Sequence, residues 1–285
     1  MTYSLVARDP ESGELGVAVQ SCAFRTGAVC AWAEPGVGAV ATQSFTEQRY
    51  GPEGLTRMRA GAPASEALAG LLAEDELREV RQVAYVDATG RIAGHTGADC
   101  IPHAGDVRGP AYGAQGNMLR SPEVVAALAE GYAAATGPLV ERLLAGLDAA
   151  EAAGGDFRGR QAAGLVVVSA DADELPYRRL VDVRVDDHPE PLAELRRLAR
   201  LNAGYARRNQ IAAGADAAEE VEAARAAGLA EHDVVLAAVF AHARNGDLER
   251  AAALVADAVA AEPLWEPAFA RYETLGLLPP GVVAT

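Results

Sequence analysis

The sequence contains no lysine, because all 25 of its basic residues are arginine. A chain without lysine has no Schiff-base lysine, no P-loop lysine and no lysine general base. Cysteine is also scarce, and Cys22, Cys30 and Cys100 show no CxxC spacing. The histidines form neither an HExxH nor an HxH motif. We therefore expect no disulfide framework, no metal site and no cofactor.

Positive charge is in short supply, since 40 acidic residues against 25 arginines give a net charge of −15. Phosphate backbones and anionic lipids are poor partners for such a chain, so we expect no nucleic-acid and no membrane partner. No apolar run approaches the roughly 20 residues of a membrane span. The start shows no signal-peptide pattern, which predicts a cytoplasmic protein.

Strand-like sequence dominates the first part of the chain, interrupted by helical segments. Predicted strands cover residues 3–8, 15–20, 28–33, 37–43, 82–87, 91–95, 111–117, 162–169 and 180–185. Predicted helices follow the fourth strand and again begin at the N-cap Ser121. From Pro189 onward the sequence predicts only helices, and we place a domain boundary near Tyr205. The expected domains are residues 1–205 and 206–285.

Within the second domain, His232 to Trp265 resembles one tetratricopeptide repeat, a two-helix unit of 34 residues. Asn245-Gly246-Asp247-Leu248 supplies the turn, and Ala251 and Ala258 are small enough for close helix packing. One repeat cannot bury its own faces. The unit is interpreted either as a docking surface for a protein partner or as plain helical packing.

Strands and helices come in blocks rather than in alternation, which argues against a doubly wound fold. The order predicts an α+β fold, an αββα four-layer sandwich of two antiparallel sheets with a helix pair on each outer face, followed by a small all-helical unit. This sandwich is the fold of the N-terminal nucleophile hydrolases. The strand that opens at Thr2, its hairpin and the strand at 37–42 resemble the start of a proteasome β-type chain.

Several segments carry a more specific resemblance. They read TYSLVARDPESGELGVAVQS, GVGAVATQS, RYGPEGL, RIAGHTGADC, QGNML, GGDFRGRQAAGL and LVDVRVDDHPEPLAELRRL. Together they resemble a widespread bacterial family, domain of unknown function 1028, which is grouped with the N-terminal nucleophile hydrolase-like folds. The resemblance runs from Thr2 to about Leu201 and implies the sandwich fold with a helical extension. It implies no particular reaction.

Thr2 is the candidate catalytic residue, because a threonine with a free α-amine combines nucleophile and base in one residue. This chemistry requires removal of Met1. A structural alternative is a capping threonine on an edge strand, and Cys22 is an alternative nucleophile. Proteasome-like enzymes add a lysine and an aspartate, but this chain has no lysine and the position resembling the aspartate is Gln20.

Polar residues at strand ends near one edge of the predicted sandwich are the candidate substrate ligands. They are Gln43, Ser44, His95, Thr96, Gln115, Asn117, Arg160 and Gln161. Structural alternatives remain open for these residues. Ser44 could cap the following helix, His95 could be a satisfied structural histidine, and Arg160 could pair with Asp182 or Asp186.

Two functions are compatible with these features. The first is an amidohydrolase of the N-terminal nucleophile type that acts on a small amide or peptide-like bond and forms a homo-oligomer. The second is a catalytically silent sandwich that binds a small ligand, while the helical tail docks a partner protein. The preserved Thr2 favours the first, and the missing lysine and acid favour the second.

Overall fold

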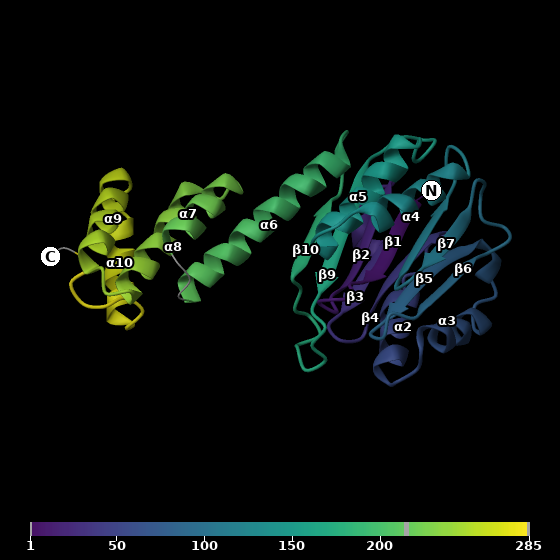
Figure 1. Cartoon of the computed structure of the whole chain (residues 1–285), viewed down its shortest axis with the longest axis horizontal. Helices are drawn as coiled ribbons and strands as arrows, with labels where there is room; N and C mark the ends of the chain where they lie inside the picture. Colours follow the sequence, from purple (N-terminus) through teal and green to yellow (C-terminus); the bar gives the residue numbers. More distant parts are fainter. Residues whose placement is uncertain (1, 214–216, 284–285) are drawn as a thin grey trace. The chain divides into compact units, whose positions relative to one another are not determined.

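The computed structural model describes residues 2–213 and 217–283, which form two compact units divided after Leu198 (Figure 1). The division falls earlier than the predicted boundary at Tyr205 and lies inside a helix that continues without a break to Ala213. Each unit has its own hydrophobic core.

The larger sheet of the first unit has the strand order β10-β9-β2-β1-β8-β7, and all neighbours are antiparallel. Its strands are β1 (Thr2–Arg8), β2 (Leu15–Ser21), β7 (Gly105–Gly109), β8 (Tyr112–Asn117), β9 (Ala162–Val168) and β10 (Val181–Val185). The strand that opens at Thr2 is therefore a central strand, not an edge strand.

The smaller sheet has the strand order β3-β4-β5-β6. Its strands are β3 (Ala31–Glu34), β4 (Gly38–Ser44), β5 (Arg81–Asp87) and β6 (Ile92–Thr96). Small side chains such as Ala39, Ala41 and Ala84 face Val6 and Val17 of the other sheet and form the core between the sheets. Because side chains alternate along a strand, every second residue of these strands points into that space.

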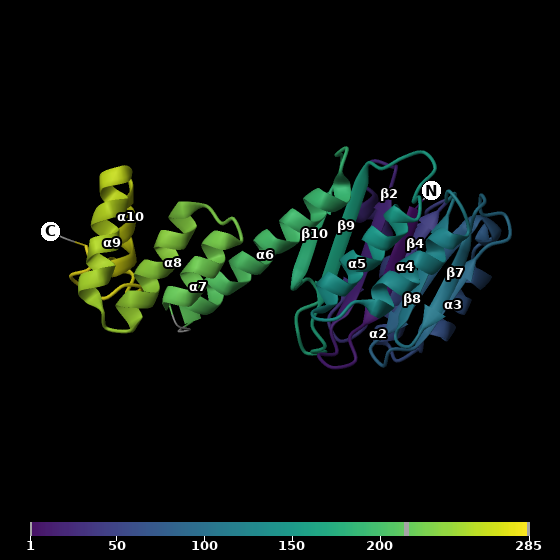
Figure 2. The ribbon, with the colours of Figure 1, turned by 45° about the horizontal axis from the view of Figure 1, so that its top comes forward.

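Helices cover the outer face of each sheet. α2 (Tyr50–Arg59) and α3 (Ala64–Ala73) pack on the smaller sheet, followed by the short η1 (Arg78–Val80). α4 (Glu123–Ala134) and α5 (Leu139–Ala152) lie across the strands of the larger sheet (Figure 2). The predicted mixed α+β fold with two antiparallel sheets is confirmed.

One local prediction was wrong, and one strand was not predicted. Residues 28–33 do not form one strand, because α1 (Thr26–Cys30) precedes β3. The helix packs on β9, where Gly27 and Gly164 approach each other so closely that a Cβ on Gly164 would lie 2.6 Å from the Cα of Gly27. Tertiary packing here overrides the β-propensity of the segment. The strand that was not predicted is β7, a half-exposed, glycine-flanked edge strand that carries little hydrophobic pattern.

The second unit is helical throughout its described part. α6 (Pro191–Ala213) enters it and is followed by α7 (Ala217–Ala226), α8 (Glu231–Arg244), α9 (Leu248–Ala261) and α10 (Trp265–Thr274). The core between α8, α9 and α10 contains Val239, Ala251, Val255 and Phe269. Asp247 caps α9 by accepting a hydrogen bond from the N–H of Arg250. In the part of the chain that is described, no helix combines the length and apolarity needed to cross a membrane.

The close approach of α1 to β9 predicts that Gly164→Ala destabilises the protein. The added Cβ meets backbone, which cannot rotate away, so we expect a loss of about 1–3 kcal/mol in the free energy of unfolding, measured with urea. The control is Gly105→Ala, whose Cβ would have nothing within 4 Å and should change stability by less than about 0.5 kcal/mol. If both substitutions lower the free energy of unfolding equally, the close approach of Gly27 and Gly164 does not require glycine at position 164.

Candidate functional site

The candidate site lies between the two sheets, at the end of the first unit where β1 begins. Thr2 is 5% exposed, pairs with Asn117 of β8 and lies on the same face of the larger sheet as Ser4, which bonds to Gln43 of the smaller sheet. Its Oγ1 donates to the Oγ of Ser21 in the neighbouring strand β2 over 3.2 Å. The ends of β2, β4 and β8 and the start of β5 meet here, because all these strands are antiparallel neighbours or face each other.

Gln43 holds the backbone of Thr2 from the facing sheet. Its Nε2 donates to the carbonyl oxygen of Thr2 over 3.1 Å and to the Oε1 of Gln82 over 2.8 Å. Its Oε1 accepts a hydrogen bond of 2.7 Å from Ser4. Gln43, Gln82 and Ser4 are all completely buried, so these bonds replace water for every one of them.

Gln82 is the centre of this amide network. Its Nε2 lies 2.8 Å from the carbonyl oxygen of Gly116, 3.0 Å from the Oγ1 of Thr96 and 3.1 Å from the carbonyl oxygen of Gly105. Its Oε1 also accepts from the Nδ2 of Asn117 over 2.9 Å. One side chain of the smaller sheet therefore ties together β6, β7 and β8.

Two amide oxygens in this network accept no hydrogen bond from the described residues. Gln115 donates to Ser4 and to the carbonyl oxygen of Ala41, and Asn117 donates to Gln82. The Oε1 of Gln115 and the Oδ1 of Asn117 are buried and have no hydrogen-bond partner among the described residues. Because an unpaired buried acceptor is costly, these two oxygens are suited to an ordered water or to a donor group of a ligand.

The amide network consists of neutral groups, and a hydrogen bond from Thr96 connects it to the carboxylate of Asp106. Thr96 accepts from Gln82 and donates from its Oγ1 to the Oδ1 of Asp106 over 3.0 Å. Asp106 also forms a 2.9 Å ion pair with Arg108, and its side chain is 23% exposed. The polar chain from Thr2 thus consists of amides and hydroxyls and ends at a carboxylate near the surface.

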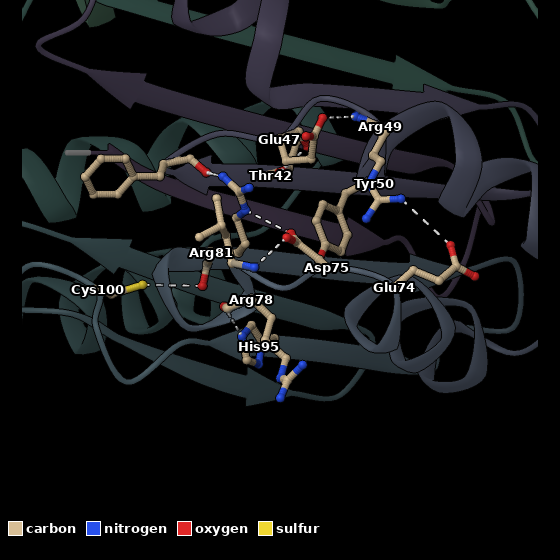
Figure 3. A network of polar contacts seen from close by, with 12 residues as sticks. Thr42, Glu47, Arg49, Tyr50, Glu74, Asp75, Arg78, Arg81, His95 and Cys100 are labelled. Atoms are coloured by element: carbon tan, nitrogen blue, oxygen red, sulfur yellow. Dashed lines mark hydrogen bonds and ion pairs between the residues drawn. The ribbon is translucent and has the colours of Figure 1, made fainter.

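Four of the proposed ligands are brought together with Thr2. These are Gln43, Thr96, Gln115 and Asn117. Ser44 and His95 are the sequence neighbours of two of them and point to the outer face of the smaller sheet. Ser44 has φ 71° and pairs with Arg81 of β5, and the Nε2 of His95 lies 2.8 Å from the carbonyl oxygen of Arg78 (Figure 3).

A buried ion pair supports the site from that outer face. Asp75 accepts from the Nε of Arg81 over 2.9 Å and from the hydroxyl of Tyr50 over 3.1 Å (Figure 3). Burial alone raises the pKa of Asp75, but these hydrogen bonds and one from the N–H of Leu77 outweigh it and hold the pKa below its ordinary value. Arg81 also donates from Nη1 to the carbonyl oxygen of Phe45 over 2.6 Å, which fixes the loop after β4.

Arg160 and Gln161 immediately precede β9, and their side chains pair with residues outside the site. Arg160 pairs with Glu190 at 2.7 Å and approaches Glu151 at 3.8 Å, so the predicted pairing with Asp182 or Asp186 is wrong. The Gln161 side chain donates to Asp187 over 3.0 Å, while its backbone N–H donates to the carbonyl oxygen of Ser21 over 3.1 Å. Gln161 therefore reaches the site through its backbone.

The comparison of Gln20 with a catalytic aspartate needs correction. Gln20 pairs with Tyr3 and shares its face of the sheet, which is opposite to the face of Thr2. Its amide is buried and both polar atoms lack partners in the described part of the chain. The β2 residue that meets Thr2 is Ser21.

Ser4, Ser21 and Gln82 also belong to the site and were not among the predicted residues. The available signal was a polar residue at an inward position of an otherwise apolar strand, as in Gln82 of RQVAYVD. Among the described residues, no three His, Cys, Asp or Glu side chains are grouped as metal ligands would be. Cys22 is half-buried, and its N–H donates to the Oδ2 of Asp156 over 2.9 Å.

The fold and the site define a mixed α+β protein in which two antiparallel sheets enclose an amide-rich polar site. The model of the family of unknown function DUF1028 matches residues 2–195, and the chain belongs to this family. A crystal structure of a Silicibacter pomeroyi protein of the same family is 31% identical, with a TM-score of 0.63, and the match covers 70% of this chain and 88% of that one.

A more remote similarity links the chain to Anbu, the ancestral beta-subunit, from Yersinia bercovieri. The identity is 12% and the TM-score 0.32 over 69% of this chain and 92% of that one, which is too distant to support an inference. No curated protein matches the chain.

The central position of Gln82 predicts that Gln82→Leu is strongly destabilising. Leucine fills a similar volume but leaves Gln43, Asn117 and the carbonyl of Gly116 without their partner, so we expect a loss of about 3 kcal/mol in a urea titration. The matched control is Gln161→Leu, whose side-chain bond is exposed and should contribute less than about 0.5 kcal/mol. If both variants unfold at the same urea concentration, the network does not stabilise the fold.

Proposed function

We propose that the protein is an amidohydrolase of the N-terminal nucleophile type, acting on a small amide or peptide-like bond. The observation that carries this proposal is the position of Thr2, at the head of a central strand with its hydroxyl between two helix-covered sheets. We interpret the layers α2/α3, smaller sheet, larger sheet and α4/α5 as the αββα sandwich of such hydrolases. Cytoplasmic location and a homo-oligomeric state remain predictions.

The chemistry begins at the hydroxyl of Thr2. Its Oγ1 bonds to the carbonyl carbon of the amide, and its proton passes to the α-amine of the same residue. The C–N bond of the tetrahedral intermediate then breaks, and the amine product leaves with that proton. Water attacks the remaining ester, releases the carboxylic acid and restores the hydroxyl.

The neighbouring side chains act by positioning rather than by proton transfer. Gln43 fixes the carbonyl of Thr2, and Ser21 accepts the hydrogen bond that orients Oγ1. No lysine exists in the chain, so no lysine amine can replace the terminal amine, whose ordinary pKa of ~8 suits it to accept the proton. Met1 lies outside the described residues, and the mechanism requires that it is removed.

This mechanism predicts that Thr2→Ala abolishes hydrolysis of p-nitroanilide amides, while Thr2→Ser retains part of it, because serine supplies the same hydroxyl and amine. The control is Thr56→Ala, which removes an exposed helix hydroxyl and should leave turnover unchanged. Intact-protein mass spectrometry establishes beforehand whether Met1 is present. A chain that keeps Met1 and still hydrolyses amides would exclude Thr2 as its own base.

A second candidate function is the catalytically silent ligand-binding domain with a docking tail. The amides around Thr2 are buried and largely bonded to one another, which is compatible with a purely structural role. The specific observation in its favour is a cavity of about 930 Å³ in the helical unit. In this interpretation α8 and α9 are the tetratricopeptide-like pair.

The cavity has an apolar floor and an acidic rim. Leu254, Trp265 and Phe269 belong to its lining, and Glu231, Asp257 and Glu262 supply carboxylates. Arg225 neutralises Glu231 through a 2.7 Å ion pair, so Asp257 and Glu262 leave the rim negative. An apolar segment with basic side chains, supplied by a partner protein, complements this surface best.

We expect a labelled helical peptide of leucine and arginine to bind this groove and to bind about fivefold more weakly to the double variant Asp257→Asn, Glu262→Gln, measured by fluorescence anisotropy. The control removes the same charge at Glu249 and Glu266, outside the residues that line the cavity. The same loss in both double variants would show that net charge, not the groove, attracts the peptide.

A further inference from the structure

The phenylalanines of the first unit are all exposed. Phe24, Phe45 and Phe157 are 63%, 56% and 44% exposed, and residues 2–198 contain no other phenylalanine. Phenylalanine is normally among the most buried residue types. The aromatic residues buried in this unit are tyrosines, namely Tyr3, Tyr50, Tyr85 and Tyr132. The exposed rings are therefore not needed to fill the core.

All three rings lie on loops at the Thr2 end of the sheets, with Phe24 after β2, Phe45 after β4 and Phe157 on the loop that leads from α5 into β9. Phe24 follows shortly after Ser21, the hydrogen-bond partner of Thr2. Phe45 comes two residues after Gln43, which binds the Thr2 carbonyl. Phe157 follows Asp156, which bridges to Leu119 and accepts the N–H of Cys22. Phe24 and Phe45 therefore lie within three residues of a hydrogen-bond partner of Thr2, and Phe157 is connected through Asp156 to Cys22, the residue after Ser21.

The backbones of the Phe45 and Phe157 loops are anchored although both rings are exposed. The carbonyl of Phe45 accepts from Arg81, which the buried Asp75 holds in place. The carbonyl of Phe157 accepts from Arg120 over 3.4 Å, and Asp156 beside it is buried. Fixed backbone with exposed rings is the arrangement of a preformed apolar surface, since little order would have to be gained on binding.

Backbone strain is concentrated at the same place. Arg25, Ser44 and Met118 have φ values of 61°, 71° and 51°, and in the described part of the chain the one further non-glycine residue with positive φ is Ala111. The three follow Phe24, Gln43 and Asn117 directly in sequence. Such conformations are unfavourable for residues with a Cβ and gather where function requires a special geometry.

We propose that Phe24, Phe45 and Phe157 form an apolar rim that binds the acyl group of the substrate, so that the preferred substrates are amides of aromatic or longer aliphatic acids. The proposal rests on the proposed function of Thr2. The acyl half is the part that stays attached to Thr2 in the ester intermediate, whereas the amine departs. A binding surface built around Thr2 therefore acts longest on the acyl half.

The test measures binding without turnover. Thr2→Ala protein is placed in equilibrium dialysis with phenylacetyl-p-nitroanilide, hexanoyl-p-nitroanilide and acetyl-p-nitroanilide. We expect the two larger amides to bind at least about tenfold more tightly than the acetyl compound. Changing Phe24, Phe45 and Phe157 to serine, singly, should each reduce this preference by roughly fivefold. The control is Tyr177→Ser, which removes a 75% exposed ring from the loop after the far end of β9 and should change nothing.

The outcomes separate this proposal from the assignment of Thr2. If wild-type protein hydrolyses all three amides at equal rates and binds them equally, the proposal that the three phenylalanines bind the acyl group is wrong, while the assignment of Thr2 as the nucleophile is kept. If the rim-dependent preference is found but no amide is hydrolysed, the rim is supported and the nucleophile is not. If the serine variants instead change the sedimentation coefficient of the free protein, the rings form an interface between copies of this chain and the proposal falls.

Discussion

Hydrogen bonds among buried amides hold together the end of the first unit where β1 begins. Gln82 accepts from Gln43 and Asn117 and donates toward the carbonyls of Gly105 and Gly116, so one side chain joins the smaller sheet to two strands of the larger one. The hydrophobic core holds the two sheets together, but it is not directional. The amides set the register in which the sheets meet, because their partners are specific atoms.

Much of the fold could be predicted from the sequence, since the strands carry a clear alternating or continuous apolar pattern and the helices of the C-terminal part carry a helical one. The failures are at α1 and β7. The segment that contains Ala28 and Val29 favours a strand by composition, yet the pairing of Gly27 with Gly164 lets a helix pack there. β7 is short and polar, and it forms a strand because it pairs with β8. The local sequence gives no sign of this tertiary contact.

The site was predictable as a region but not side chain by side chain. Gln43 and Ser44 are adjacent, as are His95 and Thr96, and in each pair one residue points between the sheets while its neighbour points outward. Successive side chains of a β-strand point to opposite faces, so two neighbouring residues cannot both point between the sheets. Which of the two points inward depends on the strand register, which the sequence alone does not determine. Gln82 was missed for the same reason.

Because the amide network is neutral, it does not contribute to the pH dependence of the site. Amides and hydroxyls of Gln43, Gln82, Ser4 and Thr96 neither gain nor lose protons across the physiological range, so the electrostatic field they impose on the Thr2 hydroxyl is the same at mildly acidic and mildly alkaline pH. A titration observed at this end of the molecule therefore reports on a group outside the network. Because the charge of the network does not change with pH, the ionisation of a single group beside it can be measured without interference from the network.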